Sequence, residues 1–204
     1  MLIWPNFQSE TNIFCAVQGL FAIVGHGIVT SSRISAILRP FMLKLPKDVT
    51  AGPRHDAVLK LLTTDTHPLW EEGRVPVPTL APTPNLATEL RWAVNVGFAT
   101  QGLEQIAKEL AREEKGLALL AEKTGVAQQA SRISRILFVT NDGAERFYRE
   151  CDSLLSRYPE RLLGCRIDAT GDELGEAIFG EPKLVRALLI NDKKAAARIL
   201  LSLI

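Results

Sequence analysis

The 204-residue chain has few of the residues that build metal centres or disulfide frameworks. Its three cysteines, Cys15, Cys151 and Cys165, form no CxxC pair, and their odd number argues against a disulfide framework or a zinc site. Free cysteines are typical of a reducing compartment. His55 and His67 have no second ligand at a spacing that metals use. We therefore expect no metal site.

Catalytic signatures are missing as well. The chain contains no GxSxG, P-loop, HExxH or paired-carboxylate pattern, so we predict no catalytic residue and no cofactor, and we favour a function other than catalysis. The net charge of only +1 leaves no overall basic field, so that nucleic-acid binding would need a local basic patch. The overall composition, with 47% hydrophobic and 23% charged residues, is that of an ordinary globular protein.

One long stretch has no formal charge. No Asp, Glu, Lys or Arg occurs in residues 11–32, and residues 13–29 are strongly apolar. This length is near the minimum for a membrane-spanning helix, and the basic residues that follow would leave the rest of the chain in the cytoplasm. The alternative is a buried core segment. We predict a cytoplasmic protein, with membrane association through 13–29 as the alternative.

The same stretch contains a glycine pattern. Residues 20–24 are typical of a buried strand, and Gly25 and Gly27 follow it, with Thr30 where a third glycine would stand. The pattern resembles the dinucleotide-binding fingerprint of flavin and nicotinamide enzymes, in which a helix N-terminus holds the pyrophosphate. The resemblance implies that Gly25 makes the tight turn, that Gly27 lets the backbone approach the phosphates and that Asp48 binds the ribose. A dinucleotide-dependent oxidoreductase is therefore one alternative function.

Proline indicates a division of the chain. Residues 74–84 contain four prolines, each of which fixes its own backbone and disfavours helix at the residue before it. We predict a stiff, extended connector here. It would separate an apolar N-terminal region, 1–73, from a domain at 85–204.

The domain at 85–204 is predicted to be mainly α, a helical C-terminal domain with room for short strands. Apolar stripes at helical spacing indicate most of its helices. Asn85 and Thr100 are expected to cap the first two helices, and Gly116 is expected to end the second. Asp142 is expected to begin a later helix in a capping-box pattern. Cys151 lies in the apolar stripe of that helix and is interpreted as a core residue.

Two further helix signals lie near the C-terminus. Thr170 and Glu173 match a capping box, and Gly180 is expected to end the helix that they begin. Asn191 or Asp192 is expected to cap the last helix.

A stretch in the middle of this domain carries the main functional pattern. Residues 117–123 suit a helix that Gly125 ends, and a second helix is predicted over 127–139. Ala121, Gly125 and Val126 resemble the first helix and turn of helix-turn-helix DNA-binding domains, over about 117–136. The polar face of the second helix offers amides and guanidinium groups for base edges and phosphates. The predicted DNA-binding residues are Gln128, Gln129, Arg132 and Arg135.

An α/β alternative is open for the same domain. Residues 136–140, 163–167 and 185–190 could form three strands that alternate with helices. The dipeptides Asn141-Asp142 and Asn191-Asp192 would then follow strands, where α/β enzymes place functional residues. Helix capping by Asn and Asp is the interpretation that we prefer.

The sequence thus leaves three functional hypotheses. The first is a regulatory or interaction protein that binds DNA through residues 117–139. The second is a membrane-anchored helical protein that binds a protein partner, and the third is the dinucleotide-dependent oxidoreductase. The oligomeric state is not predicted.

Overall fold

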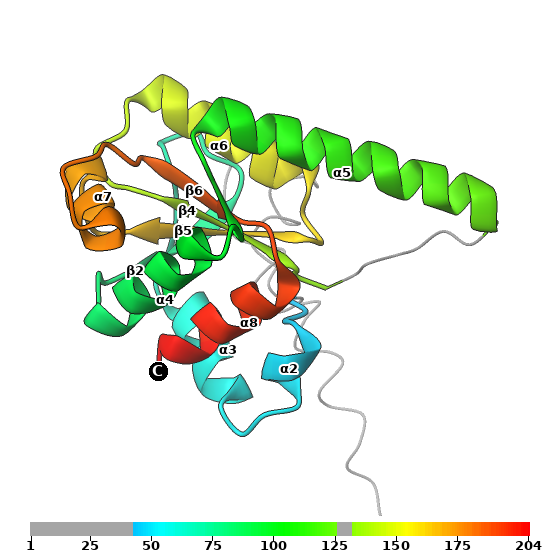
Figure 1. Cartoon of the computed structure of the whole chain (residues 1–204), viewed down its shortest axis with the longest axis horizontal. Helices are drawn as coiled ribbons and strands as arrows, with labels where there is room; N and C mark the ends of the chain where they lie inside the picture. The colour runs from blue at the N-terminus through cyan, green and yellow to red at the C-terminus, as the bar shows by residue number, and fades with distance from the viewer. Residues whose placement is uncertain (1–42, 126–131) are drawn as a thin grey trace, which may run out of the picture.

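The computed structural model describes residues 43–125 and 132–204, which form a six-stranded sheet with helices on both faces (Figure 1). The strands are β1 (Thr66–Pro68), β2 (Pro76–Leu80), β3 (Ala99–Gln101), β4 (Arg135–Val139), β5 (Leu162–Ile167) and β6 (Ala187–Ile190). The helices are α2 (Lys47–Thr50), α3 (His55–Thr64), α4 (Pro84–Asn95), α5 (Leu103–Thr124), α6 (Glu145–Arg157), α7 (Gly171–Phe179) and α8 (Lys193–Ser202).

The strand order is β1-β2-β5-β4-β6-β3. The three strands β2, β5 and β4 are parallel, whereas β6 is antiparallel to β4, and β1 and β3 are antiparallel to their neighbours. We call the edge at which β2, β5 and β4 end, and at which β6 begins, the carboxyl edge. The opposite edge, where β4 begins, is the amino edge.

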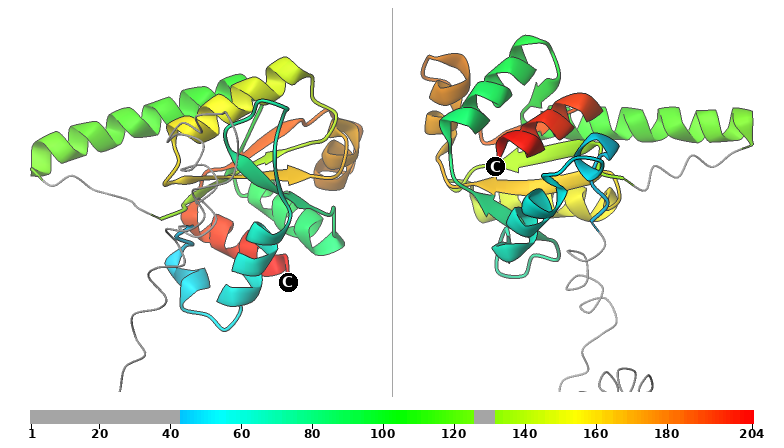
Figure 2. Two further views of the ribbon diagram at one scale, coloured as in Figure 1. Left: turned by 180° about the vertical axis from the view of Figure 1, so that it is seen from behind. Right: turned by 90° about the horizontal axis from the view of Figure 1, so that it is seen from below.

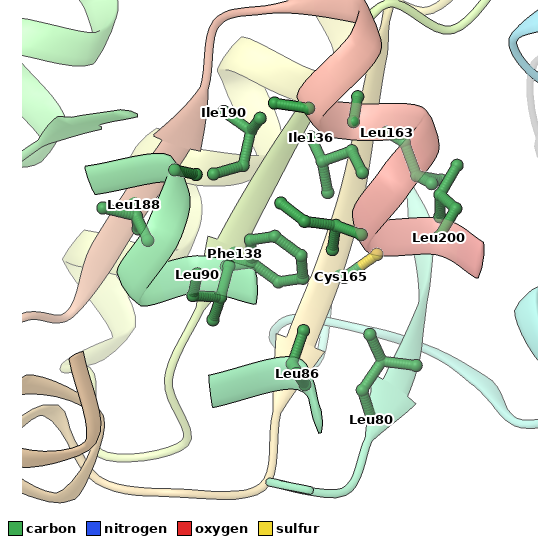
Figure 3. Packing of buried hydrophobic residues seen from close by; sticks show 14 of the residues in the cluster. Leu80, Leu86, Leu90, Ile136, Phe138, Leu163, Cys165, Leu188, Ile190 and Leu200 are labelled. Carbon is green, nitrogen blue, oxygen red and sulfur yellow. The ribbon is translucent and has the colours of Figure 1, made fainter. Parts of the chain in front are cut away.

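Alternate residues of the central strands enter two separate hydrophobic clusters, because successive side chains of a strand point to opposite faces of the sheet. In β4, Ile136 and Phe138 pack with α4 and α8, while Leu137 and Val139 pack with α5 and α6. Figure 3 shows Phe138 beside Leu90 of α4 in the first cluster. Since both faces are covered, these strands are apolar throughout and show no alternation of polar and apolar residues.

The mainly α prediction is wrong, and the described chain is a mixed α/β protein. The α/β alternative is confirmed for its three strands, which the structure places at β4, β5 and β6. The predicted helix over 127–139 conflicts with β4, which occupies 135–139, and residues 126–131 lie outside the described residues. A short apolar run fits a buried strand or a buried helix equally well, because periodicity cannot separate them.

Several helix boundaries also differ from prediction. Helix α5 continues through Gly116 and ends at Gly125, whose left-handed backbone was predicted. Thr83, and not Asn85, caps α4, with Pro84 in the first helical position. Thr100 belongs to β3, and Gly102 precedes α5 with no side-chain cap. The capping box at the start of α7 and the Asp192 cap of α8 are confirmed.

The proline-rich segment 74–84 contributes β2 to the sheet. Pro76 and Pro78 pair with the three-residue edge strand β1, whereas the pairing with β5 uses Thr79 and Leu80, beyond the last proline of the strand. Proline is compatible with such a position because its missing N–H is not needed by a central neighbour.

No helix within 43–125 and 132–204 is long and apolar enough to cross a membrane. The segment 13–29, for which a membrane span was one alternative, lies outside these ranges.

Candidate functional site

The loops after β4 and β5 diverge at the carboxyl edge. The loop after β4 leads into α6 on one face of the sheet, and the loop after β5 leads into α7 on the other face (Figure 1). In open α/β sheets such a divergence opens a crevice outside the strand ends, and ligands bind there. A ligand site is therefore expected at the residues of these two loops.

Asp142 joins three parts of this edge. Its Oδ1 accepts hydrogen bonds from Thr140 Oγ1 at 2.6 Å and from the backbone N–H of Gly171 at 3.1 Å. Its Oδ2 accepts from Arg186 Nε at 3.3 Å. The carboxylate therefore connects the end of β4, the N-terminus of α7 and the residue that precedes β6. We call this group the Asp142 network.

The network sets the charge state of Asp142. Partial burial alone would raise the pKa of this carboxyl group. The hydrogen bonds from Thr140, Gly171 and Arg186 favour the ionised form and outweigh burial, so that the pKa lies below its ordinary value. Asp142 is thus held as an anion at the N-terminus of α7, the position at which many α/β proteins bind a phosphate.

The loop after β5 is fixed from both sides. Asn141 Nδ2 donates to Asp168 Oδ1 at 3.0 Å, and the backbone N–H of Asp168 donates to Leu80 O at 2.9 Å. The ends of β4, β5 and β2 are thereby linked across the edge. Asp168 Oδ2 has no hydrogen-bond partner among the described residues, so one oxygen of this carboxylate faces outward uncommitted.

A pocket of about 270 Å³ opens beside Asp168, between α4 and α7. Its apolar wall includes Leu86 and Leu90 of α4, Ile167 of β5 and Leu174 of α7. Among the described residues that line it, only Asp168 and Glu173 are charged.

Glu173 has a second role in the capping box of α7. Its Oε2 accepts from Thr170 N at 2.7 Å and from Thr170 Oγ1 at 2.9 Å. These two bonds, the backbone bond first, lower the pKa of Glu173. Its Oε1 has no hydrogen-bond partner among the described residues, and like Asp168 Oδ2 it can accept from a ligand.

The predicted DNA-binding residues lie elsewhere or outside the described ranges. Gln128 and Gln129 fall within 126–131 and are not described. Arg132 is exposed at the amino edge, where its Nη1 donates to Leu45 O at 3.2 Å. Arg135 is half-buried in β4, and its guanidinium is bonded to Glu113 of α5 at 2.6 and 2.9 Å. DNA binding by this set stays a prediction, and of its two described members only Arg132 has an exposed side chain.

The predicted dinucleotide residues are not assembled by the described chain. Gly25 and Gly27 lie outside it, and Asp48 is exposed in the short helix α2, which precedes every described strand. Within the described ranges, no three His, Cys, Asp or Glu side chains converge as a metal ion would require.

Neither the pocket nor the Asp142 network was predicted from the sequence. Thr170 and Glu173 were predicted only as a helix cap, and Asp142 was predicted to begin its own helix. In the structure α6 begins after Ala144 without a side-chain cap, and Asp142 bonds to α7 instead. One signal in the sequence could have indicated the pocket, because Asp168 directly follows the predicted strand 163–167.

Comparisons with known proteins provide no functional assignment. No protein-family model and no curated protein sequence matches the chain. Among solved structures, the chain is similar to a protein of unknown function from Bacillus halodurans C, with 14% identity, over 59% of this chain and 98% of that one. The TM-score of 0.39 is too low for any inference to be drawn from that similarity.

Proposed function

We propose that this protein binds a small organic cation, such as a primary amine attached to an apolar body, in the pocket between α4 and α7. The supporting observation is the lining of the pocket, in which two carboxylates meet an apolar wall without any Lys or Arg. The volume of about 270 Å³ is slightly below the roughly 300–1,000 Å³ that ligand pockets occupy. The ligand is therefore small.

The two parts of the pocket would have different roles. An ammonium group can donate to Asp168 Oδ2 and Glu173 Oε1, while the apolar body contacts Leu86, Leu90 and Leu174. Because Asp168 is exposed, its ion pair is worth only about 0.2–1 kcal/mol. Burial of the apolar body supplies most of the affinity, and the carboxylates select the charge of the ligand.

The N-terminus of α7 supports a cation rather than an anion. A free helix N-terminus at this edge would attract phosphate. Here the amide of Gly171 is already bonded to Asp142, and the amide of Glu173 is bonded to Thr170 Oγ1. The protein's own groups thus satisfy these donors, and a phosphate would meet the carboxylates of the rim.

Binding is favoured over catalysis because the described residues of the edge present no activated nucleophile. The Thr140 hydroxyl is buried and donates to Asp142. Cys151 and Cys165 are buried, and burial raises the pKa of Cys151 to about 12 and raises that of Cys165 as well. Neither thiol can therefore be ionised near neutral pH.

Three ligands with one apolar body test the proposal. Titration calorimetry would compare phenethylamine, 2-phenylethanol and phenylacetate, whose polar groups are cationic, neutral and anionic. We expect the amine to bind about two- to five-fold more tightly than the alcohol, which corresponds to one exposed ion pair, and the carboxylate to bind least. Equal binding of all three, or no binding of any, would contradict the proposal.

Variants of the pocket locate the binding. Asp168→Asn should remove the preference for the amine over the alcohol, because it removes a negative charge of the rim. Ala177→Leu should abolish binding of all three ligands by filling the pocket that Ala177 lines. Asp172→Asn is the matched control, since Asp172 is exposed on the same helix and does not line the pocket. Loss of binding in the control alone would place the ligand elsewhere.

A further inference from the structure

Helix α5 extends well beyond the sheet, past the amino edge (Figures 1 and 2). Its first half packs on the sheet through the buried residues Ile106 and Leu110. We call residues 113–124 the projecting half. It contains no buried residue, although its sequence continues the apolar pattern of the first half.

The projecting half contains a run that is apolar around the whole helix. Residues 116–121 read Gly-Leu-Ala-Leu-Leu-Ala, without a single polar side chain. Leu119 is 57% exposed and Leu120 is 48% exposed, and a Cβ added at Gly116 would meet no atom within 4 Å. A helix that is apolar on all sides is normally buried, and exposed apolar patches normally mark an interaction site. Leu117 and Ala121 are half-buried, whereas the described residues leave Leu119 and Leu120 exposed.

We propose that residues 13–29 of the same chain cover the projecting half of α5. This segment is strongly apolar and belongs to the charge-free stretch 11–32. It therefore offers the complementary chemistry for the run at 116–121, because burying two apolar surfaces against each other removes both from water.

The position at which the described chain begins supports this occupant. Lys44 O accepts from Ile133 N at 2.8 Å, and Leu45 O accepts from Arg132 Nη1 at 3.2 Å. Both contacts lie at the amino edge, beside the return from α5 to β4 and on the side to which α5 projects. Residues 1–42 thus enter the described fold next to the surface that they would cover.

The connecting segment, residues 30–42, is longer than the helix surface that it would have to follow. Residues 30–42 can span roughly 40 Å when extended, at about 3.3 Å per residue. The projecting half is only about 18 Å long, at about 1.5 Å per residue. The tether also raises the effective concentration of 13–29 at α5 to the order of millimolar, whereas a second copy must be recruited from solution. Gln18 and His26 are costly inside a bilayer but can be accommodated at the edge of a protein contact.

A photo-reactive residue in the full chain tests the proposal. Benzoylphenylalanine would replace Leu120, and the adducts formed on irradiation would be mapped by peptide mass spectrometry. The same residue at Leu184, which is 53% exposed, is the matched control on the carboxyl side of the molecule. We expect an adduct between position 120 and a peptide from 13–29 in the monomer, in at least five-fold higher yield than from position 184.

Mixing isotopically light and heavy protein separates the outcomes. Adducts that join light and heavy chains would show that a second copy covers the face and would overturn the proposal. Equal yields of 13–29 adducts from positions 120 and 184 would also overturn it. In a sample with added lipid vesicles, adducts of position 120 with lipid and with no peptide would overturn it as well. Unfolding midpoints near that of the parent would show that both substituted proteins fold.

Discussion

The dipeptide Asn-Asp follows a strand twice in this protein, with different results at the two edges of the sheet. After β6, Asp192 caps its own helix, and its Oδ1 accepts from Lys194 N and Ala195 N at 2.8 Å. After β4, Asp142 leaves its own helix uncapped and bonds to Gly171 and Arg186, which are distant in sequence. The first aspartate stabilises one helix end, and the second holds three elements together.

The difference arises from the direction of the strands. Because β6 is antiparallel to β4, the two dipeptides lie at opposite edges. At the carboxyl edge Asp142 meets the N-terminus of α7, since the chain enters that helix beside the end of β4. At the amino edge the side chain of Asn191 donates to Thr100 Oγ1 at 3.2 Å, and Asp192 has only its own helix to cap. The same dipeptide therefore makes hydrogen bonds to its own helix at one edge, and to residues that are distant in the sequence at the other.

The largest expected effect comes from displacing the loop that leads to Arg186. A Cβ at Gly175 would lie 1.5 Å from the backbone oxygen of Lys183, so that Gly175→Ala must displace this loop from α7. We expect a loss of about 3 kcal/mol or more in the free energy of unfolding, measured in urea. Gly116→Ala is the control, because its added methyl group meets no described residue within 4 Å and the replacement of a helical glycine should stabilise the chain by about 0.5–1 kcal/mol.

Removal of Asp142 tests its long-range role. Asp142→Ala leaves the buried Thr140 hydroxyl and the amide of Gly171 without their partner, and it removes the ion pair with Arg186. We expect a loss of about 2–3 kcal/mol in urea unfolding. A loss in the free energy of unfolding below about 1 kcal/mol would show that the Asp142 network does not stabilise the contact between β4, α7 and the residue before β6.

Removal of Asp192 should have a smaller effect, because only a helix cap is lost. Asp192→Ala should lower the free energy of unfolding by about 1 kcal/mol. Hydrogen exchange should show faster opening at the start of α8 and unchanged protection at α7. Faster exchange at α7 in this variant would contradict the distinction between the two aspartates.

Acidification should reduce the contribution of Asp142 to the free energy of unfolding, by less than the substitutions above do. Since the pKa of Asp142 is lowered by folding, its stabilising contribution is present above the unfolded-state pKa and is lost as the pH falls through the folded-state value. The difference in unfolding free energy between the parent and Asp142→Asn should therefore shrink between pH 7 and about pH 3. A difference that grows on acidification would contradict the sign of this pKa shift.

The signals of single elements were readable from the sequence. The glycines after α5 and α7, the capping box of Thr170 and Glu173, and the burial of Cys151 were all predicted from local chemistry and are confirmed. Local signals of this kind do not depend on what packs against the element.

The fold class could not be predicted from such local signals. Residues 136–139 are apolar without alternation because helices cover both faces of β4. The prolines of β2 argued against a strand at 76–80, but Pro76 and Pro78 pair with the short edge strand β1. The pocket was missed for a related reason. Leu86, Asp168 and Glu173 come from three separate elements, and only the sheet order brings them together.

The position of β2 has a consequence for how the chain folds. β4, α6 and β5 are consecutive in the sequence, and β4 pairs directly with β5. In contrast, α4, β3, α5, β4 and α6 lie between β2 and its partner β5 in the sequence. Closing that long loop costs entropy before any contact repays it. We therefore expect β4, α6 and β5 to be formed in the folding transition state, and the β1–β2 hairpin to dock afterwards. Refolding should then be slow compared with that of helical bundles of the same size, in which most contacts are local.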